Sequence, residues 1–337
     1  MRLGLRYDMR VPEFGAPPAG LYAAAVEQCA WADQLGFDYV HLAEHHGAED
    51  GYCPSPLILG AAIASATRTL QLRFSALVLT MHDPLRLAED LAVLDLISGG
   101  GRIRVIAGIG YRPHEFAMFG VDFAQRARQF EQKLEVLRQA WTGEPFAYRG
   151  TTVRVTPTPC TPGGPAIYLG GSAVPSARRA ARLGYGYCPT SEELYEVYER
   201  ECAKLGRPAP EPFSRQGPVF LHVTDDPDRD WPALAPHIVH ATNLYAQWAR
   251  ERPDDTSNGL WREVSGVEDL KADPNIWVVT PEECVRRARR LRADDELRFH
   301  PLLGGLPPEV SWRSLRLFAD EVLPCLERAR AAVPAAS

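Results

Sequence analysis

Hydrophobic positions follow two different periods along this chain. Short apolar runs typical of strands, such as residues 3–7 and 39–42, are separated by longer segments in which apolar residues recur every three or four positions. In the segment 21–35 this recurrence runs through Val26 and Cys29 and stops at Gly36, a helix-ending signal. The pattern therefore predicts strand–helix units that follow one another along the chain.

Eight such strands are predicted, most of them separated by helices. The predicted strands are residues 3–7, 39–42, 70–79, 103–107, 166–169, 185–188, 218–223 and 297–300. The predicted helices are residues 21–35, 56–67, 85–97, 126–141, 176–183 and 192–205. Strands joined by helices pair in parallel with right-handed crossovers, and eight of them close into a barrel. We therefore expect an α/β fold, a (β/α)8 TIM barrel with insertions, as a single domain over residues 1–337.

Two connections are longer than ordinary loops. They are residues 143–165 and the polar, proline-rich residues 250–274. We interpret both as insertions on one barrel, and we hypothesise that the second is a mobile lid over the site.

Composition narrows the class of protein. Of the 337 residues, 45% are hydrophobic and 24% are charged, as in ordinary globular proteins, and the formal net charge of -6 without a basic block argues against a nucleic-acid partner. No apolar window is long enough for a membrane span. The seven cysteines are scattered without a C-x-x-C pair, and the start lacks the features of a signal peptide. We expect a bacterial, cytoplasmic protein.

Candidate chemistry lies directly after the second predicted strand. The run FDYVHLAEHH, residues 37–46, ends in Glu44, His45 and His46. In a barrel, residues just past the carboxyl end of a strand line the active-site face, and imidazoles titrate near neutral pH. The alternative interpretation is a pair of surface histidines in a loop.

A metal site must be weighed against this interpretation. His41, Glu44 and His45 spell the H-x-x-E-H pattern of inverted zinc peptidases, which works only on a helix. Here the pattern begins in a predicted strand, so we expect no metal. We expect the remaining candidate histidines to be structural or to lie on the surface. They are His82, His222, His237, His240 and His300. Of these, His300, just past the last predicted strand, is the best candidate for a functional role.

Two glycine-rich segments follow predicted strands. YLGGS, residues 168–172, precedes a helix, so backbone N–H groups near Gly171 and the helix dipole favour a phosphate, with the Ser172 hydroxyl as a further donor. A plain turn with Ser172 as the helix cap is the alternative. Residues 108–113 lack the third glycine of the dinucleotide fingerprint, so a Rossmann site is not supported.

Taken together, these motifs resemble the bacterial luciferase-like flavin monooxygenase family. The order and spacing of the motifs carry the resemblance, which is dense over the first two thirds of the chain. The motifs are residues 37–46, 54–57, 75–79, 82–84, 88–90, 94–100, 110–113, 115–116 and 168–172, followed by 280–283 and 311–326. The resemblance implies a TIM barrel that binds reduced FMN, or its deazaflavin relative F-420, at the carboxyl ends of the strands.

The resemblance also implies roles for single residues. His45 matches the catalytic histidine of the family, with Glu44 and His46 beside it. The Ser75–Ala76 bond falls where family members often have a non-prolyl cis peptide beneath the flavin ring. Further cofactor-binding positions are implied around the ring, at Gly108, Gly110 and Tyr111, and around the phosphate, at Gly170, Gly171 and Ser172.

One position departs from the family pattern. Ile109 stands where the luciferase branch has an arginine that contacts the FMN phosphate. Either phosphate affinity is weak in this chain or another arginine substitutes, with Arg178 and Arg179 in the following helix as candidates.

Three hypotheses of function remain open. The first is a monooxygenase that uses reduced FMN and dioxygen on a small organic substrate, with His45 handling a proton and Glu44 orienting His45. The second is an F-420-dependent dehydrogenase or reductase, and the third is a non-catalytic flavin-binding protein. The first implies a separate, transient flavin reductase as partner, and we expect a homodimer.

Overall fold

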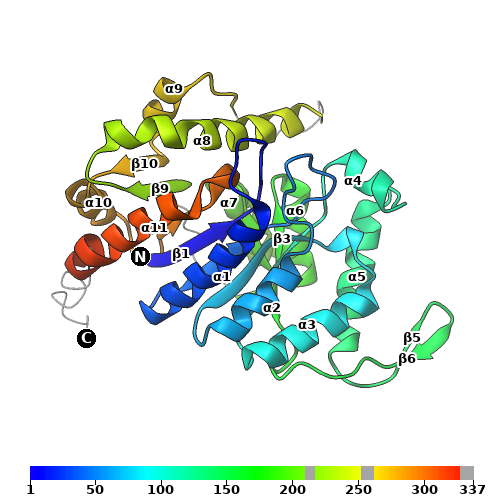
Figure 1. Ribbon diagram of the computed structural model, residues 1–337. Coiled ribbons are helices and arrows are strands. Elements are labelled where there is room, and N and C mark those ends of the chain that lie inside the picture. The colour runs from blue at the N-terminus through cyan, green and yellow to red at the C-terminus, as the bar shows by residue number, and fades with distance from the viewer. Residues whose placement is uncertain (209–216, 252–261, 327–337) are drawn as a thin grey trace.

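The computed structural model describes residues 1–208, 217–251 and 262–326. Its main element is a curled sheet of seven parallel strands in the order β11-β1-β2-β3-β4-β7-β8 (Figure 1). These strands are β1 Arg2–Tyr7, β2 Tyr39–Leu42, β3 Gln71–Val78, β4 Ile103–Gly108, β7 Ala166–Gly171, β8 Gly186–Pro189 and β11 Glu296–Phe299.

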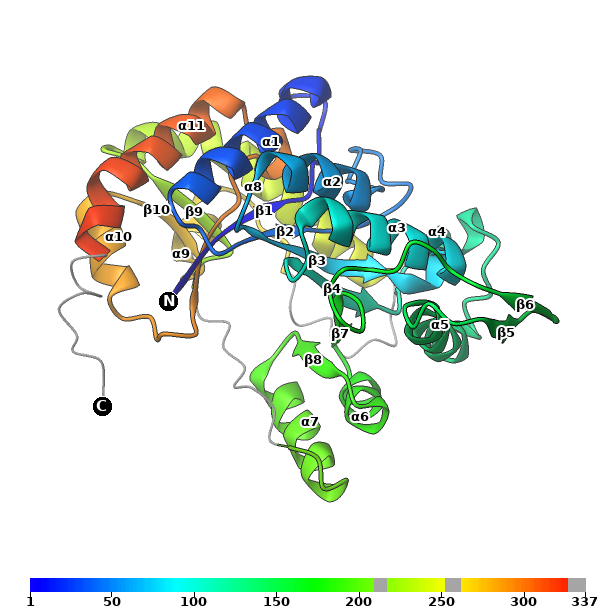
Figure 2. The same ribbon diagram turned by 90° about the horizontal axis from the view of Figure 1, so that it is seen from below.

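Helices cover the outer face of this sheet. Figure 2 shows α1, α2 and α3 side by side along one face, and β8 with α6 and α7 at one end of the sheet. The helices are α1 Pro18–Gln34, α2 Pro56–Ala66, α3 Pro84–Ser98, α4 Pro113–Met118, α5 Arg126–Ala140, α6 Val174–Leu183, α7 Glu192–Lys204, α8 Pro227–Arg250, α9 Val267–Ala272, α10 Pro281–Ala288 and α11 Pro308–Leu317.

The helix boundaries follow from local signals in the sequence. The Asp83 side chain accepts hydrogen bonds from the first backbone N–H groups of α3, and Pro84 occupies the first helical position, where no N–H is needed. The same helix ends at Gly99, whose φ of 80° is left-handed and favours glycine.

The strands present one face to the helices and the other to the inside of the curl. On β1, Leu3, Leu5 and Tyr7 are buried against the helices. The Tyr7 hydroxyl donates to Gln28 Oε1 of α1 at 2.9 Å, and Gln28 Nε2 donates to Ser311 Oγ of α11 at 2.8 Å. Residues Gly4 and Arg6 alternate with them and face inward, since successive side chains point to opposite faces. The outer face therefore carries the apolar core.

The barrel is not closed by strand pairing in the described residues, in contrast to the predicted eight-stranded barrel. The predicted seventh strand, β9 Phe220–Val223, pairs in parallel with β10 Ile276–Val279 in a separate two-stranded sheet. The sequence pattern did not predict β10, because only four apolar residues follow a polar, proline-rich stretch. The paired strands thus form a curled half-barrel beside a smaller parallel pair.

Both long connections contain structure of their own. Residues 143–165 include the antiparallel hairpin of β5 Phe146–Tyr148 and β6 Thr151–Val153, which projects from the sheet in Figure 1. Residues 250–274 begin at the end of α8 and include α9, whereas residues 252–261 lie outside the described part of the chain. The lid hypothesis for this stretch stays a prediction.

The 24-residue helix α8 was not predicted. Its internal Pro232 and Pro236 normally argue against a helix, because proline removes a backbone donor. Both lie in the first half of the helix, and the spacing of Trp231, Leu234 and Ile238 buries one apolar face. Tertiary burial therefore outweighs the local propensity.

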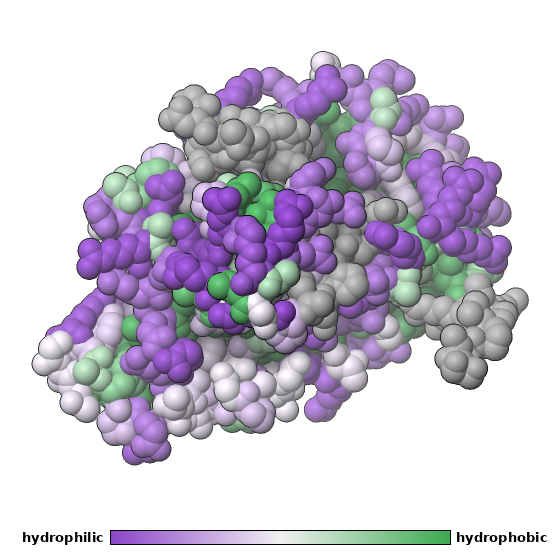
Figure 3. Space-filling view, turned by 180° about the vertical axis from the view of Figure 1, so that it is seen from behind, coloured by the Kyte–Doolittle hydropathy of each residue, from purple (hydrophilic) through white to green (hydrophobic). Residues whose placement is uncertain are grey.

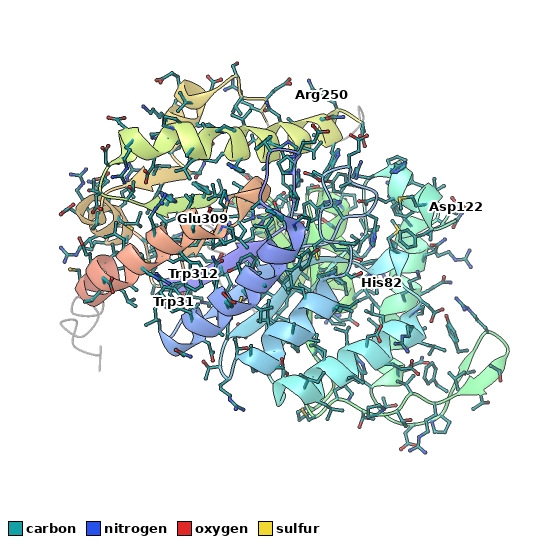
Figure 4. All side chains as sticks on the ribbon, viewed as in Figure 1. Trp31, His82, Asp122, Arg250, Glu309 and Trp312 are labelled. Atoms are coloured by element: carbon teal, nitrogen blue, oxygen red, sulfur yellow. The ribbon has the colours of Figure 1, made fainter. Side chains whose placement is uncertain are left out.

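The surface is mixed in character. Figure 3 shows a largely hydrophilic face with apolar residues in small separate areas. At the outer side, Trp31 of α1 and Trp312 of α11 meet edge to face with ring centroids 5.6 Å apart (Figure 4). None of the described helices combines the length and apolar character needed to cross a membrane.

We predict that Asp33 is a main anchor of the outer layer. Its carboxylate accepts backbone hydrogen bonds from Arg68, Thr69 and Leu70 at 2.6–2.9 Å, which join the end of α1 to the start of β3. Replacing Asp33 with Ala should lower the free energy of unfolding, measured by urea denaturation, by about 2 kcal/mol. The exposed Glu27→Ala on the same helix is the control.

The effect should depend on pH. Burial raises the pKa of Asp33, but the hydrogen bonds from Thr69 and its neighbours lower it more, so the net shift is downward from 3.8. The stabilisation is thus present above that value and is lost as the pH falls through the folded pKa. A difference between wild type and Asp33→Ala that stays constant down to strongly acidic pH would contradict this account.

Candidate active site

His45 is held by a carboxylate from a distant part of the chain. His45 follows β2, and Glu115 lies in the first turn of α4. The His45 Nδ1 atom is 2.8 Å from Glu115 Oε1, and the same oxygen accepts the backbone N–H of His46 at 3.0 Å. Glu115 is fully buried. Two segments seventy residues apart are thus joined at the carboxyl ends of the strands.

The protonation states of this pair follow from burial and contact. Burial lowers the pKa of His45 below 6.5, although the bond to Glu115 works in the opposite direction. Burial raises the pKa of Glu115, but the hydrogen bond from His45 outweighs it and the net shift is downward. An ionised carboxylate only accepts hydrogen bonds, so Nδ1 carries the proton and a neutral ring keeps its lone pair at Nε2.

Glu44 does not orient His45, contrary to the hypothesis above. Its Oε1 atom accepts from His46 Nε2 at 2.9 Å and from His82 Nε2 at 2.8 Å, and Oε2 accepts the backbone N–H of Val78 at 2.5 Å. Burial raises the pKa of Glu44, but the bonds from His46 and His82 lower it to about 2. Glu44 thus fixes the end of β3, and the orienting group of His45 is Glu115.

Aromatic rings surround the exposed edge of His45. Tyr52 and Trp248 each lie with ring centroids 4.8 Å from the imidazole, and Tyr111 lies at 5.5 Å with its hydroxyl 3.5 Å from Nε2. Trp248 comes from the last turn of α8, the helix that ends at Arg250 in Figure 4. The end of α8 therefore covers the carboxyl ends of the strands beside His45.

Two buried arginines hold Trp248 in place. The guanidinium of Arg112 lies 4.1 Å from the Trp248 ring centroid, and that of Arg10 lies 4.7 Å away. Arg10 also contacts Asp8 at 3.5 Å and Asp50 at 3.4 Å. Such cation–π contacts between desolvated groups are worth about 2 kcal/mol each. The wall over His45 is thus rigidly supported.

The glycines implied for a flavin ring stand beside a cis peptide. The Ser75–Ala76 bond is cis, as the resemblance implied. A Cβ atom on Gly108 would lie 3.0 Å from Ala76 Cβ, and Gly110 has a φ of 78°. Tyr111 follows directly and faces His45. The two neighbouring strand ends, β3 and β4, therefore pack closely beside the cis bond and leave little room for a side chain at Gly108.

The second glycine segment forms the turn between β7 and α6. The cap of α6 is Ala173, without a side-chain hydrogen bond, so Ser172 is not the helix cap. A Cβ atom on Gly171 would collide with the Ser176 side chain. Gly170, Gly171 and Ser172 are partly exposed, and the helix start follows them. The turn can therefore present N–H groups and the Ser172 hydroxyl to an anion.

The two arginines proposed as substitutes for the position of Ile109 have other partners. Arg179 Nε is 3.0 Å from Glu131 Oε1, and Arg178 Nε is 3.7 Å from Glu201 Oε1. Both point to carboxylates of neighbouring helices, so neither is placed to substitute for an arginine at Ile109.

The other candidate histidines have varied surroundings. His41 lies on β2, so the H-x-x-E-H pattern starts in a strand as expected. His300 Nε2 lies 3.5 Å from Asp8, His222 contacts Asp230, His237 contacts the Gly304 carbonyl, and His240 contacts Asp50. Within the described residues, no group of three or more His, Cys, Asp or Glu side chains is arranged to hold a metal.

Sequence reasoning missed several residues of this site. Glu115 and Arg112 were noted only as parts of motifs, and Arg10 and Trp248 were not considered. Local pattern carries no signal for them, because they reach His45 from separate loops and from α8. The one available hint for Glu115 was that it is the acidic residue within the motif at residues 110–116.

Curated relatives match this chain over different lengths. Uncharacterized protein y4vJ of Sinorhizobium fredii is 28% identical over 92% of this chain and 93% of its own length. Uncharacterized protein y4wF of the same organism is 36% identical, but the match covers 41% of this chain and 40% of y4wF. N-acetyl-S-alkylcysteine monooxygenase of Bacillus subtilis is 26% identical over 51% of this chain and 52% of the relative. The chain thus spans about half or less of two of these relatives.

Solved structures share the fold. Monooxygenase RslO1 from Streptomyces bottropensis has a TM-score of 0.73 at 24% identity, covering 96% of this chain and 99% of that one. The oxygenating constituent of 3,6-diketocamphane monooxygenase from Pseudomonas putida, in complex with FMN, has a TM-score of 0.72 at 19% identity, with 96% and 98% covered. An F420-dependent secondary alcohol dehydrogenase has a TM-score of 0.64 at 17% identity, with 96% and 98% covered.

The match to a family model shows to which family the chain belongs. The model described as luciferase-like monooxygenase matches residues 1–294, which is most of the chain. The chain therefore belongs to the luciferase-like monooxygenase family, a family of enzymes.

Proposed function

We propose that this protein is a flavin-dependent monooxygenase that uses reduced FMN and dioxygen to oxygenate a small organic substrate. The observation that carries the proposal is the buried His45–Glu115 pair at the strand ends, beside the cis Ser75–Ala76 bond, in a chain of the luciferase-like family. Reduced flavin supplies the electrons that activate dioxygen. The protein must bind the flavin, exclude water and handle a proton.

The residues present fit such a cofactor. Gly108 packs against Ala76, and Gly110 packs against Phe116 and Val78, so side chains at these glycines would disturb the strand ends that we assign to the flat ring. The turn with Gly170, Gly171 and Ser172 supports the phosphate through backbone N–H groups and the helix dipole. Tyr111 joins these positions to His45. We assign the flavin ring to the ends of β3 and β4 and the flavin phosphate to the turn between β7 and α6.

His45 handles the proton at Nε2 in this proposal. Glu115 fixes the ring orientation and tautomer through Nδ1, and the lowered pKa of His45, caused by burial, keeps the imidazole neutral near pH 7. A neutral Nε2 can accept a proton and return it later. Trp248 and Tyr52 pack against the imidazole and support the exclusion of water from the ring. Glu44 supports the site through His46, His82 and the end of β3.

Further parts of the proposal concern the whole chain. We infer a TIM barrel as a single domain over residues 1–337, supported by the parallel strand order and by relatives of the same fold. We also propose that a separate reductase supplies reduced flavin, that two copies of the chain form a homodimer, and that the protein acts in the cytoplasm.

A second candidate function is an F-420-dependent dehydrogenase or reductase. The observation that favours it is Ile109, which removes the arginine that FMN-using members place near the phosphate, together with the structural likeness to an F420-dependent secondary alcohol dehydrogenase. The same strand-end site serves hydride transfer without dioxygen. A non-catalytic flavin-binding protein fits less well, because it has no need of the buried His45–Glu115 pair.

We predict that His45→Ala separates chemistry from cofactor binding. Because His45 lies at the end of β2 and the proposed phosphate turn follows β7, reduced FMN should bind with nearly unchanged affinity. Substrate oxygenation should fall by ~10² to 10⁴, the usual contribution of one acid–base group. Coupling is measured as oxygen consumed against hydrogen peroxide released, with a substrate found by screening.

The control is His114→Ala, which removes an exposed imidazole in the first turn of α4. It should leave oxygenation unchanged. If His45→Ala retained full oxygenation, the proton role would be wrong, and if it lost flavin binding instead, His45 would be a wall of the pocket.

We predict that Glu115 acts on the reaction through His45. Because the Glu115 carboxylate raises the pKa of His45 against the effect of burial, Glu115→Gln should lower that pKa further. The acidic limb of the kcat/KM profile, where His45 becomes protonated, should therefore move to lower pH, while kcat falls by about tenfold or more. Flavin affinity should remain.

The exposed Glu49→Gln, on the same loop as His45, removes an equal charge and serves as the control. Its pH profile should match that of the wild type. An acidic limb that stays in place in Glu115→Gln, with only a uniform loss of rate, would reduce Glu115 to a structural residue.

A further inference from the structure

The inner face of the sheet carries a row of basic side chains. Arg6 on β1 is paired in register with His41 on β2, His41 with Arg73 on β3, and Arg73 with Arg104 on β4. We call these four residues the inner basic row. Residues in register on neighbouring strands lie about 4.8 Å apart, so the row crosses four adjacent strands without interruption.

The orientation of the row follows from the outer face. Leu5, Leu42, Phe74 and Val105, which adjoin the row in sequence, are buried in the apolar core. The row therefore points to the inside of the curl. Barrel interiors are normally filled by branched apolar side chains such as Val, Ile and Leu. A row of cations in that place calls for a compensating negative charge.

Among the described residues, the carboxylates that contact the row do not balance the positive charge of its arginines. Glu296 on β11 is shared between two arginines, with Arg73 at 2.9 Å and Arg298 at 3.4 Å. Arg6 donates to the Tyr245 hydroxyl at 3.4 Å and Arg104 donates to the Tyr168 hydroxyl at 2.9 Å, and both acceptors are neutral phenols.

The nearby acidic groups are shared among several cations. Asp8, which directly follows β1, contacts Arg10 and His300 at 3.5 Å and also interacts electrostatically with Arg6, and Asp50 contacts Arg10 and His240. The region thus holds five arginines, namely Arg6, Arg10, Arg73, Arg104 and Arg298, against the three carboxylates Asp8, Asp50 and Glu296. It has an excess of positive charge.

The row is partly exposed and has an unused donor. Arg6 and Arg104 are partly exposed, and the Arg73 side chain is 10% exposed. The Arg73 Nε atom is buried without a hydrogen-bond partner among the described residues, while its guanidinium lies 3.9 Å from the Tyr39 ring centroid. A planar guanidinium with an unused N–H is well suited to an oxyanion.

The row lies directly beneath the proposed flavin site. Arg73 precedes Ser75 by one inward-facing position on β3, and Arg104 precedes Gly108 by two such positions on β4. Each inward-facing step along a strand is about 6.7 Å. We infer that the inner basic row binds an oxyanion, a carboxylate or phosphate group of the substrate, so that this monooxygenase acts on an anionic organic acid. The inference rests on the proposed function.

The test measures binding of inorganic phosphate to the full chain without flavin, by calorimetry at pH 7 and fixed ionic strength. Arg104 forms no ion pair with the described residues. Arg104→Gln removes this donor from the row and should raise the phosphate Kd by about tenfold or more. Arg138→Gln, an exposed arginine on α5, removes the same charge outside the row and should leave the Kd unchanged. Arg104→Lys should retain most of the affinity.

Thermal unfolding of each variant shows whether the fold persists. If Arg104→Gln does not fold, Arg104→Lys compared with wild type at rising salt tests the same contact. The inference is overturned if wild type shows no saturable phosphate binding, or if Arg104→Gln and Arg138→Gln have the same Kd.

A second experiment tests whether the anion that binds to the row belongs to the substrate or is the phosphate group of the flavin. Reduced FMN and reduced riboflavin are titrated with and without saturating phosphate. We expect the FMN Kd to be unaffected. Competition of phosphate with FMN but not with riboflavin would assign the row to the cofactor and overturn the substrate assignment. Flavin binding without phosphate binding contradicts this inference alone, whereas phosphate binding without flavin binding contradicts the proposed function alone.

Discussion

The hydrogen bond between His45 and Glu115 is the contact on which the candidate site depends. It joins the loop after β2 to the helix after β4 and leaves the lone pair of the imidazole at Nε2, which faces the Tyr111 hydroxyl at 3.5 Å. Because Glu115 is fully buried, an unpaired Glu115 carboxylate would be costly, so the pair stabilises the loop arrangement as well as the tautomer. Trp248, Tyr52 and Arg112 pack around the loop that this bond positions.

The two faces of the sheet have different roles: the outer face stabilises the fold, and the inner face carries the polar groups near the proposed reaction. Outward residues such as Leu5 and Phe74 form the apolar core with the helices, whereas inward positions carry Arg6, Arg73 and Arg104. An ordinary barrel fills its interior with apolar side chains. Here the half-open curl leaves the inner face polar and partly exposed, so charged groups lie beneath the strand ends where the reaction is proposed.

The sequence predicted the elements whose signals are local. The first four strands and their helices were predicted to within a few residues, because apolar runs there end at clear glycine and proline signals such as Gly36 and Gly99. The helix α8 was missed because Pro232 and Pro236 oppose a helix locally, and β10 was missed because it closely follows the polar, proline-rich residues 250–274. It pairs with β9 in a separate sheet, and the predicted closed barrel is not observed in the described residues.

Only part of the candidate site was predicted, because only some of its residues lie in contiguous sequence motifs. His45 and the cis bond at Ser75 were accessible through the family resemblance, since each lies in a contiguous motif. The partner of His45 was not, because Glu44 is adjacent in sequence but turns toward His46 and His82, while Glu115 arrives from seventy residues away. Such a contact depends on the tertiary fold and leaves no local pattern.

The most direct test of the account is an anaerobic titration of the purified protein with reduced FMN, oxidised FMN and reduced F-420, followed by quenching of the protein's tryptophan fluorescence. A flavin monooxygenase built on this site should bind reduced FMN more tightly than either of the others. Tighter binding of F-420 would contradict the account and favour hydride transfer, and binding of oxidised FMN alone would point to a non-catalytic flavin-binding protein.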